Sequence, residues 1–205
     1  MEDKITSEKE SLEIISRMIQ SSKNNMQVGR GNYLLYSGYF TAILSVTLFV
    51  LITITHNGMW SWGWMLMFVH HFVITYKRRQ YKPLVVTYTD KVIRQVWRVL
   101  GSMFSLTFIA IAILGEAYGQ YDFALMMPLS LLYVGIGVSI NGIILRERWM
   151  IYSPLIAFLF AFYMLMMLVT GRHITVVWNL YLGLSFVVMQ IIPGHIINKK
   201  AKHQC

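Results

Sequence analysis

The sequence predicts an all-α polytopic membrane protein with six transmembrane helices arranged as three hairpins, preceded by an N-terminal cytoplasmic amphipathic helix. Hydrophobic residues make up 56% of the 205-residue chain and charged residues 13%, and the mean hydropathy is +0.53. One soluble core of this length cannot hide that much apolar surface, whereas a bilayer accepts it. Two further observations support the same class. Six apolar segments are long enough to cross a membrane, and lysine and arginine lie almost entirely on one side of them.

The N-terminal segment, residues 1–31, is polar and is expected to lie in the cytoplasm. It lacks the early apolar run of a signal peptide, so we expect no cleavage. Ser7 and Glu10 have the spacing of a capping box. The next apolar residues recur at three- and four-residue steps, which places them on one helical face: Leu12, Ile15, Met18 and Ile19. Such a helix packs on the bundle or lies in the lipid interface. Binding to a partner or to a second copy is the alternative.

Six apolar segments form the expected transmembrane domain, residues 32–198. A helix rises 1.5 Å per residue, so about 20 apolar residues cross the roughly 30 Å of hydrocarbon. The approximate spans are 33–55, 59–76, 97–115, 123–145, 149–170 and 174–197. Short turns at 56–58, 115–121 and 171–173 join them in pairs, which predicts three helical hairpins.

The longest connection, between the second and third spans, is strongly basic. Its first half carries Lys77, Arg78, Arg79 and Lys82, which we expect to set orientation and to contact anionic lipid headgroups. In its second half Thr89 or Asp90 can cap a helix. The apolar face of that helix would comprise Val92, Ile93, Val96, Trp97 and Leu100. We therefore expect a surface helix that leads into the third span.

The distribution of lysine and arginine predicts the orientation. Seventeen of these residues lie in the N-terminal segment, the basic connection, the turn after the fourth span and the tail at 199–205. Arg172 alone lies on the opposite side. Because lysine and arginine accumulate on the cytoplasmic side, both termini are expected in the cytoplasm. The net charge of +9 is explained by this bias, so we expect no nucleic-acid partner.

Motifs for catalysis, nucleotide binding and metal binding are absent from the sequence. It contains no glycine-rich phosphate loop, no Gly-x-Ser-x-Gly and no His-Glu-x-x-His, and Cys205 is its one cysteine. We therefore expect no cofactor, no bound metal and no enzymatic activity. The span interiors also lack Asp, Glu, Lys and Arg. This argues against ion-coupled transport, which usually uses such a group.

Neutral polar and histidine side chains lie in the cytoplasmic halves of three spans, namely His70, His71, Asn141, Gln190 and His195. Hydrogen bonds between helices are one explanation, since they avoid unpaired polar groups in lipid. A pocket for a small molecule or a lipid headgroup, open to the cytoplasm, is the other. His70 and His71 are adjacent and point about 100° apart, so both cannot easily face one ligand.

The last span has a face of small and polar residues and a proline near its end. Asn179, Gly183 and Gln190 share this face with Phe186 and Gly194, a pattern that lets helices approach closely or lines a cavity. At 193–194 a Pro-Gly pair removes a backbone donor and relaxes the chain. We expect it to kink or end the helix.

Four stretches resemble an uncharacterised family of six-span membrane proteins from Bacteroidetes bacteria. They are residues 13–19 ahead of the first span, 33–38 at its start, 87–91 with Trp97 in the connection, and 191–198 at the end. The resemblance extends over most of the chain. It implies a bacterial inner-membrane location and carries no activity or functional residues.

Two classes of function fit these observations. The first is a non-enzymatic membrane sensor or regulatory scaffold, favoured by the N-terminal helix, the basic connection and the lack of catalytic groups. The alternative is a small permease or channel, favoured by the small-residue helices and the polar cluster within the membrane. Membrane lipids are expected partners in either case, together with a cytoplasmic protein or a second copy of the chain.

Overall fold

The structure is a computed structural model that describes residues 13–14, 30–80, 88–119, 123–172 and 175–203. The described residues form helices joined by short turns, with no strand among them, which confirms the all-α prediction. The predicted amphipathic helix at the N-terminus lies outside the described residues apart from Glu13 and Ile14, which are helical.

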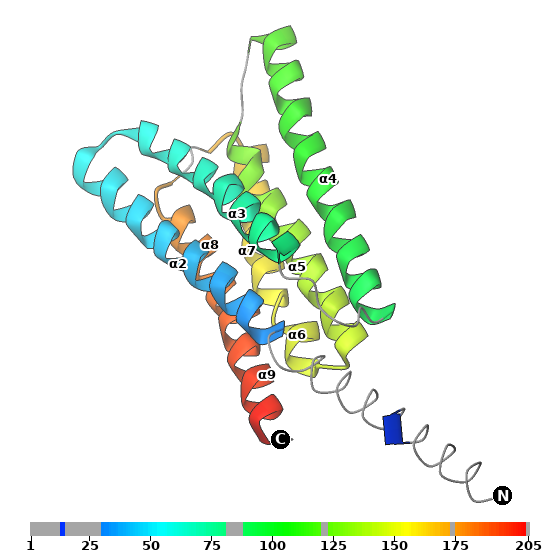
Figure 1. Cartoon of the computed structure of the whole chain (residues 1–205). Helices are drawn as coiled ribbons and strands as arrows, with labels where there is room; N and C mark the ends of the chain where they lie inside the picture. The colour runs from blue at the N-terminus through cyan, green and yellow to red at the C-terminus, as the bar shows by residue number, and fades with distance from the viewer. Residues whose placement is uncertain (1–12, 15–29, 81–87, 120–122, 173–174, 204–205) are drawn as a thin grey trace, which may run out of the picture.

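Figure 1 shows the helices side by side in one bundle, α2 along one flank and α4 along the other. In chain order the elements are α2 (Arg30–Thr55), η1 (Gly58–Met65), α3 (Leu66–Gln80), α4 (Tyr88–Tyr118), η2 (Phe123–Leu125), α5 (Met126–Leu145), α6 (Arg148–Tyr152), α7 (Leu155–Val169), α8 (Trp178–Phe186), η3 (Val187–Ile191) and α9 (Ile192–His203).

Five helical stretches of the described chain are long and apolar enough to cross a membrane: Leu34–Thr55, Tyr88–Tyr118, Phe123–Leu145, Arg148–Val169 and Trp178–Lys200. Large apolar side chains point outward along them, including Ile43, Leu106 and Leu159. An apolar exterior of this extent is unfavourable in water and favourable in lipid. The protein is therefore a membrane-embedded, polytopic helical bundle.

The second predicted span differs from a regular helix. Asn57 caps a 3₁₀-helical stretch, η1, by accepting a hydrogen bond from the backbone N–H of Met59 at 2.9 Å. The α-helical part, α3, begins only at Leu66 and contains 15 residues. It continues to Gln80, past the expected end at 76. Lys77, Arg78 and Arg79 thus belong to the last turn of α3 and not to a loop. Lys82 lies outside the described residues.

The third and fifth spans also depart from expectation. The predicted surface helix and the third span form one continuous helix, α4, of 31 residues. The fifth span is interrupted after α6, where Ser153 and Pro154 separate it from α7. Proline has no N–H to donate to the preceding turn, which explains the interruption.

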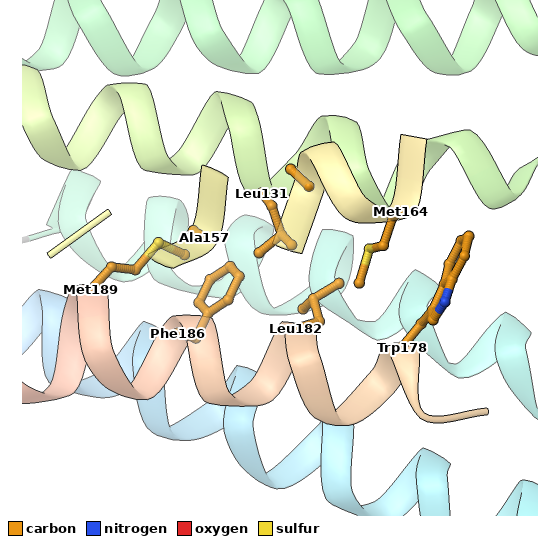
Figure 2. Packing of buried hydrophobic residues seen from close by; sticks show 8 residues of the cluster. Leu131, Ala157, Met164, Trp178, Leu182, Phe186 and Met189 are labelled. Atoms are coloured by element: carbon orange, nitrogen blue, oxygen red, sulfur yellow. The ribbon is translucent and has the colours of Figure 1, made fainter. Parts of the chain in front are cut away.

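The core lies where α8 and η3 face α5 and α7. Figure 2 shows Trp178, Leu182, Phe186 and Met189 pointing from the last span toward Leu131 and toward the α7 residues Ala157 and Met164. Together with Ala161, these residues are almost completely buried. α2 packs along the opposite side of the last span, against α8, η3 and α9, whereas α4 packs on α5. The last span is therefore the central helix of the bundle.

Hydrogen bonds and an ion pair join several chain segments at one end of the bundle. Asn198 donates a hydrogen bond from Nδ2 to Oδ1 of Asn32 at 2.8 Å, which joins the end of α9 to the start of α2. Lys200 forms an ion pair with Glu147 at 2.5 Å, which adds the turn between α5 and α6. The beginning of α2 and the end of α9 therefore lie at the same end.

The expected close approach of small residues occurs between α2 and α8. A Cβ atom added at Gly183 would lie 3.0 Å from Cβ of Ser45 and closer still to its hydroxyl oxygen. That hydroxyl donates a hydrogen bond to the backbone carbonyl of Asn179. Glycine at 183 thus brings the two backbones into contact, as small residues do in membrane helix pairs.

Candidate functional site at the π-helical turn

The last span contains a π-helical turn, η3, between α8 and α9. The backbone N–H of Ile192 bonds to the carbonyl of Val187, five residues earlier. Pro193 follows and supplies no N–H, so a carbonyl of this turn lacks its helical donor. The helix does not end at the Pro-Gly pair, as one of our alternatives expected, but continues through α9. Wide turns of this kind often occur at functional sites.

Gln190 lies within this turn and is 3% exposed. Its Oε1 atom is buried and has no hydrogen-bond partner. Gly38 of α2 lies directly opposite, because a Cβ atom there would be 3.1 Å from Cβ of Gln190 and 2.8 Å from Cγ1 of Ile191. A buried amide oxygen without a donor is unfavourable by about 1–3 kcal/mol, so its retention needs an explanation.

Asn141 on α5 is the second buried amide and is 6% exposed. Its Oδ1 atom also has no hydrogen-bond partner. Asn141 follows Val138 by three residues and therefore shares its face of α5. Val138 belongs to a buried cluster with Leu34 of α2 and Met150 of α6, and Ile197 of α9 packs against this cluster. Asn141 therefore lies close to the place where these helices meet α5.

His70 on α3 is half-buried, and its ring stacks on that of Phe40 with centroids 4.1 Å apart and planes 4° apart. The Nε2 atom of His70 is buried and lacks a partner. This contact joins α3 to α2 on the side of α2 that also carries Thr41, whose hydroxyl lies 3.5 Å from Sδ of Met67. Three of the five predicted site residues therefore carry a buried polar atom without a partner.

The remaining two predicted residues lie on the outer surface. His71 is exposed, so the two adjacent histidines do diverge. His195 is also exposed, and its Nε2 atom is 2.8 Å from the hydroxyl of Tyr39 on α2. The structure does not bring these two side chains to the others. Ligand binding by any of the five stays a prediction, as does headgroup binding by Lys77, Arg78, Arg79 and Lys82.

A second polar group in the bundle is fully paired. Asn179 accepts a hydrogen bond from Nε1 of Trp64 at 2.9 Å and donates one to the carbonyl of Val176 at 3.0 Å. Its backbone carbonyl accepts from Ser45. These contacts join η1, α2 and α8. The sequence analysis did not predict the roles of Trp64 and Ser45. The spacing of Gly38, Thr41 and Ser45, at three- and four-residue steps, is the signal that could have indicated a polar seam on α2.

The described residues contain no group of three or more His, Cys, Asp or Glu side chains that could hold a metal ion. Among the described residues, the buried side-chain atoms without a hydrogen-bond partner are two amide oxygens, one ring nitrogen and the hydroxyl of Ser153. Each of them could form a hydrogen bond with a ligand.

Comparison with known proteins gives no match to a family model, to a curated protein or to a solved structure.

Proposed function

We propose that the chain is a six-span protein of the bacterial inner membrane with both termini in the cytoplasm. Support comes from the contact between Asn32 and Asn198, because helix ends on one side require an even number of crossings between them. Five clear spans plus η1 and α3 make six. The charges agree, since Arg94, Arg146 and Lys199 belong to segments of that end. Membership of the six-span Bacteroidetes family is part of this proposal.

Fusions to alkaline phosphatase, which is active only outside the cytoplasm, test this topology. We expect activity after His56 and Gly119, and none after Gln80 or Ala201. The junction after Gln80 is decisive for α3. Equal activity after His56 and after Gln80 would mean that α3 does not cross the membrane, and the six-span arrangement would be wrong.

We further propose that this protein acts as a non-enzymatic membrane sensor or regulatory scaffold that binds a small polar molecule at Gln190. The observation that carries this proposal is the buried, unpaired Oε1 of Gln190, on the π-helical turn that packs against Gly38. A ligand that donates a hydrogen bond there would restore the missing partner. It would also change how the last span packs against α2. The start of α2 and the end of the last span lie together at the basic end of the bundle, where a partner could detect the change.

Ligand-linked stabilisation tests the sensor proposal. The purified chain is heated with and without the dialysable fraction of a bacterial lysate, and the folded fraction is followed by size-exclusion chromatography. At a ligand concentration 100-fold above Kd the folded state gains about 2.7 kcal/mol. We expect wild type to be stabilised and Gln190→Leu to show no response. Equal stabilisation of both proteins would exclude Gln190 as the binding residue.

A small permease or channel is the second candidate. The specific observation in its favour is the wide turn with Pro193, because transporters often bind substrates at interruptions of membrane helices. Flux through proteoliposomes separates the two functions. The scaffold proposal expects leakage of ions, amino acids and sugars no faster than from empty liposomes. Uptake that Gln190→Leu and Asn141→Leu abolish would instead establish the permease.

A further inference from the structure

Helix α4 presents an exposed stripe that begins with two arginines and continues with two small residues. Arg94, Arg98, Gly101 and Ser105 follow one another at three- and four-residue steps and thus lie on one side of the helix. All four are exposed. A Cβ atom added at Gly101 would meet nothing within 4 Å. No other described part of the chain therefore covers the middle of this stripe.

Gly101 and Ser105, the small residues of the stripe, lie beside larger side chains, and we call this line of small residues the channel. On the side toward α3, Phe104 and Phe108 contact Phe68, with centroids 5.6 and 6.1 Å apart. Leu106 borders the other side and is 65% exposed. The hydroxyl of Ser105 donates to the carbonyl of Gly101 at 3.0 Å, so it does not require a polar partner from outside. The channel is thus compatible with a hydrocarbon chain.

The arginines mark the end of the channel that reaches the headgroups. With 31 residues, α4 is longer than a membrane requires. At 1.5 Å per residue it spans about 46 Å, against roughly 30 Å of hydrocarbon. Its first turns also carry Lys91 and Asp90. Within the described residues, no carboxylate forms an ion pair with Arg94 or Arg98. Their guanidinium groups are available to an external anion.

We propose that this stripe binds one anionic phospholipid. The phosphate lies on Arg94 and Arg98, whose planar guanidinium groups can each donate two hydrogen bonds to it. One acyl chain lies along Gly101 and Ser105. Headgroup binding is thus proposed on α4, in addition to the basic residues of α3 that the sequence analysis indicated. This proposal does not depend on ligand binding at Gln190.

A second copy of the chain fits this stripe less well. Copies inserted in one membrane share the same orientation, so a symmetric contact through Gly101 would place Arg94 and Arg98 of both copies together. Like charges in contact are unfavourable, and the nearest acidic residue on this side of α4, Asp90, is outnumbered by the two arginines. An anionic lipid, in contrast, has its negative headgroup at the membrane surface, at the same depth as the two arginines.

Native mass spectrometry of the full chain in mild detergent tests the proposal. The protein is titrated with phosphatidylglycerol and with phosphatidylcholine that carries the same acyl chains. We expect wild type to prefer phosphatidylglycerol. A basic residue near an anionic surface contributes about 1 kcal/mol, so Arg94→Gln and Arg98→Gln should each weaken phosphatidylglycerol binding about fivefold, and the double variant about thirtyfold. Gly101→Leu, which fills the channel without a clash, should weaken binding of both lipids.

Arg148→Gln, at the same end of the bundle, and Arg172→Gln, at the other, are the matched controls and should bind phosphatidylglycerol like wild type. Equal binding of the two lipids by wild type would overturn the proposal. So would an equal loss from Arg148→Gln, because binding would then follow total charge. If Gly101→Leu changes the oligomeric mass and leaves lipid binding intact, the stripe is an interface between copies and the proposal is wrong.

Discussion

Gly183→Leu is expected to prevent stable folding of the bundle. A leucine at this position cannot fit, because even its Cβ atom would overlap Ser45 on α2. The two helices must then separate, which also breaks the hydrogen bond from Ser45 to the carbonyl of Asn179. Overpacking of a core typically lowers stability by about 1–3 kcal/mol. We expect the four-carbon side chain of leucine at this close contact to lower it by about 3 kcal/mol or more. Thermal unfolding in detergent and the yield of monodisperse protein measure this loss.

Two variants separate this clash from a general effect of mutating glycine. Gly101→Ala is the control, since its Cβ atom meets nothing within 4 Å and alanine favours the helix. It should match or slightly exceed wild type in stability. Gly183→Ala should be destabilised, and the addition of Ser45→Gly should recover part of the loss because it removes the obstructing atoms. If Ser45→Gly and Gly183→Ala have simply additive effects, the contact between α2 and α8 is not the cause.

Much of the fold was predictable because the relevant signals are local. Long apolar stretches separated by turn residues specify membrane helices. The bounds of three expected spans, 33–55, 123–145 and 149–170, agree to within one residue with Leu34–Thr55, Phe123–Leu145 and Arg148–Val169. The exceptions depend on packing. The Trp-rich stretch 58–65 is apolar enough for an α-helix, yet Gly63 packs against Leu48 and Trp64 bonds to Asn179, and the backbone is 3₁₀-helical. Such contacts are not visible in local composition.

The residue types of the candidate site were predictable from the sequence, but the directions of their side chains were not. The sequence predicts Gln190, Asn141 and His195 in the same half of the membrane, yet the first two are buried and His195 is exposed beside Tyr39. A soluble helix shows its buried face through hydrophobic periodicity. A membrane helix is apolar on both its lipid face and its packed face, so periodicity does not tell which way a polar residue points.

The π-helical turn illustrates the same limit for the backbone. Pro193 indicates that a hydrogen bond is missing, and the sequence therefore predicted a kink or an end. The structure instead widens the turn at Val187–Ile191 and continues the helix to His203. The core residues Phe186 and Met189 on one side and Gly38 on the other hold this segment in place. Burial on both sides favours continuation, because an open end would expose further unpaired backbone groups.

Gln190→Leu should make the protein more stable, whereas Asn179→Leu should make it less stable. Both changes replace a buried amide of the last span by a side chain of similar size. Gln190 has an unpaired Oε1, so leucine removes an unfavourable group and should add about 1–2 kcal/mol. The side chain of Asn179 bonds to Trp64 and to Val176, so leucine removes two hydrogen bonds and should cost about 1–2 kcal/mol. Thermal unfolding of the two variants beside wild type shows whether each substitution raises or lowers the stability.

Opposite signs would mean that the amide at 190 is retained against stability, as expected for a group that binds a ligand. Gln190→Leu would then be the more stable protein and the one that no longer responds to the small-molecule fraction. A destabilised Gln190→Leu would contradict this, because it would show that the amide already has a partner within the bundle. Gln190→Glu adds a third comparison at the same site. It keeps an acceptor but introduces a charge, so it should lower stability in the absence of a ligand, since an ionised group between tightly packed membrane helices is strongly unfavourable.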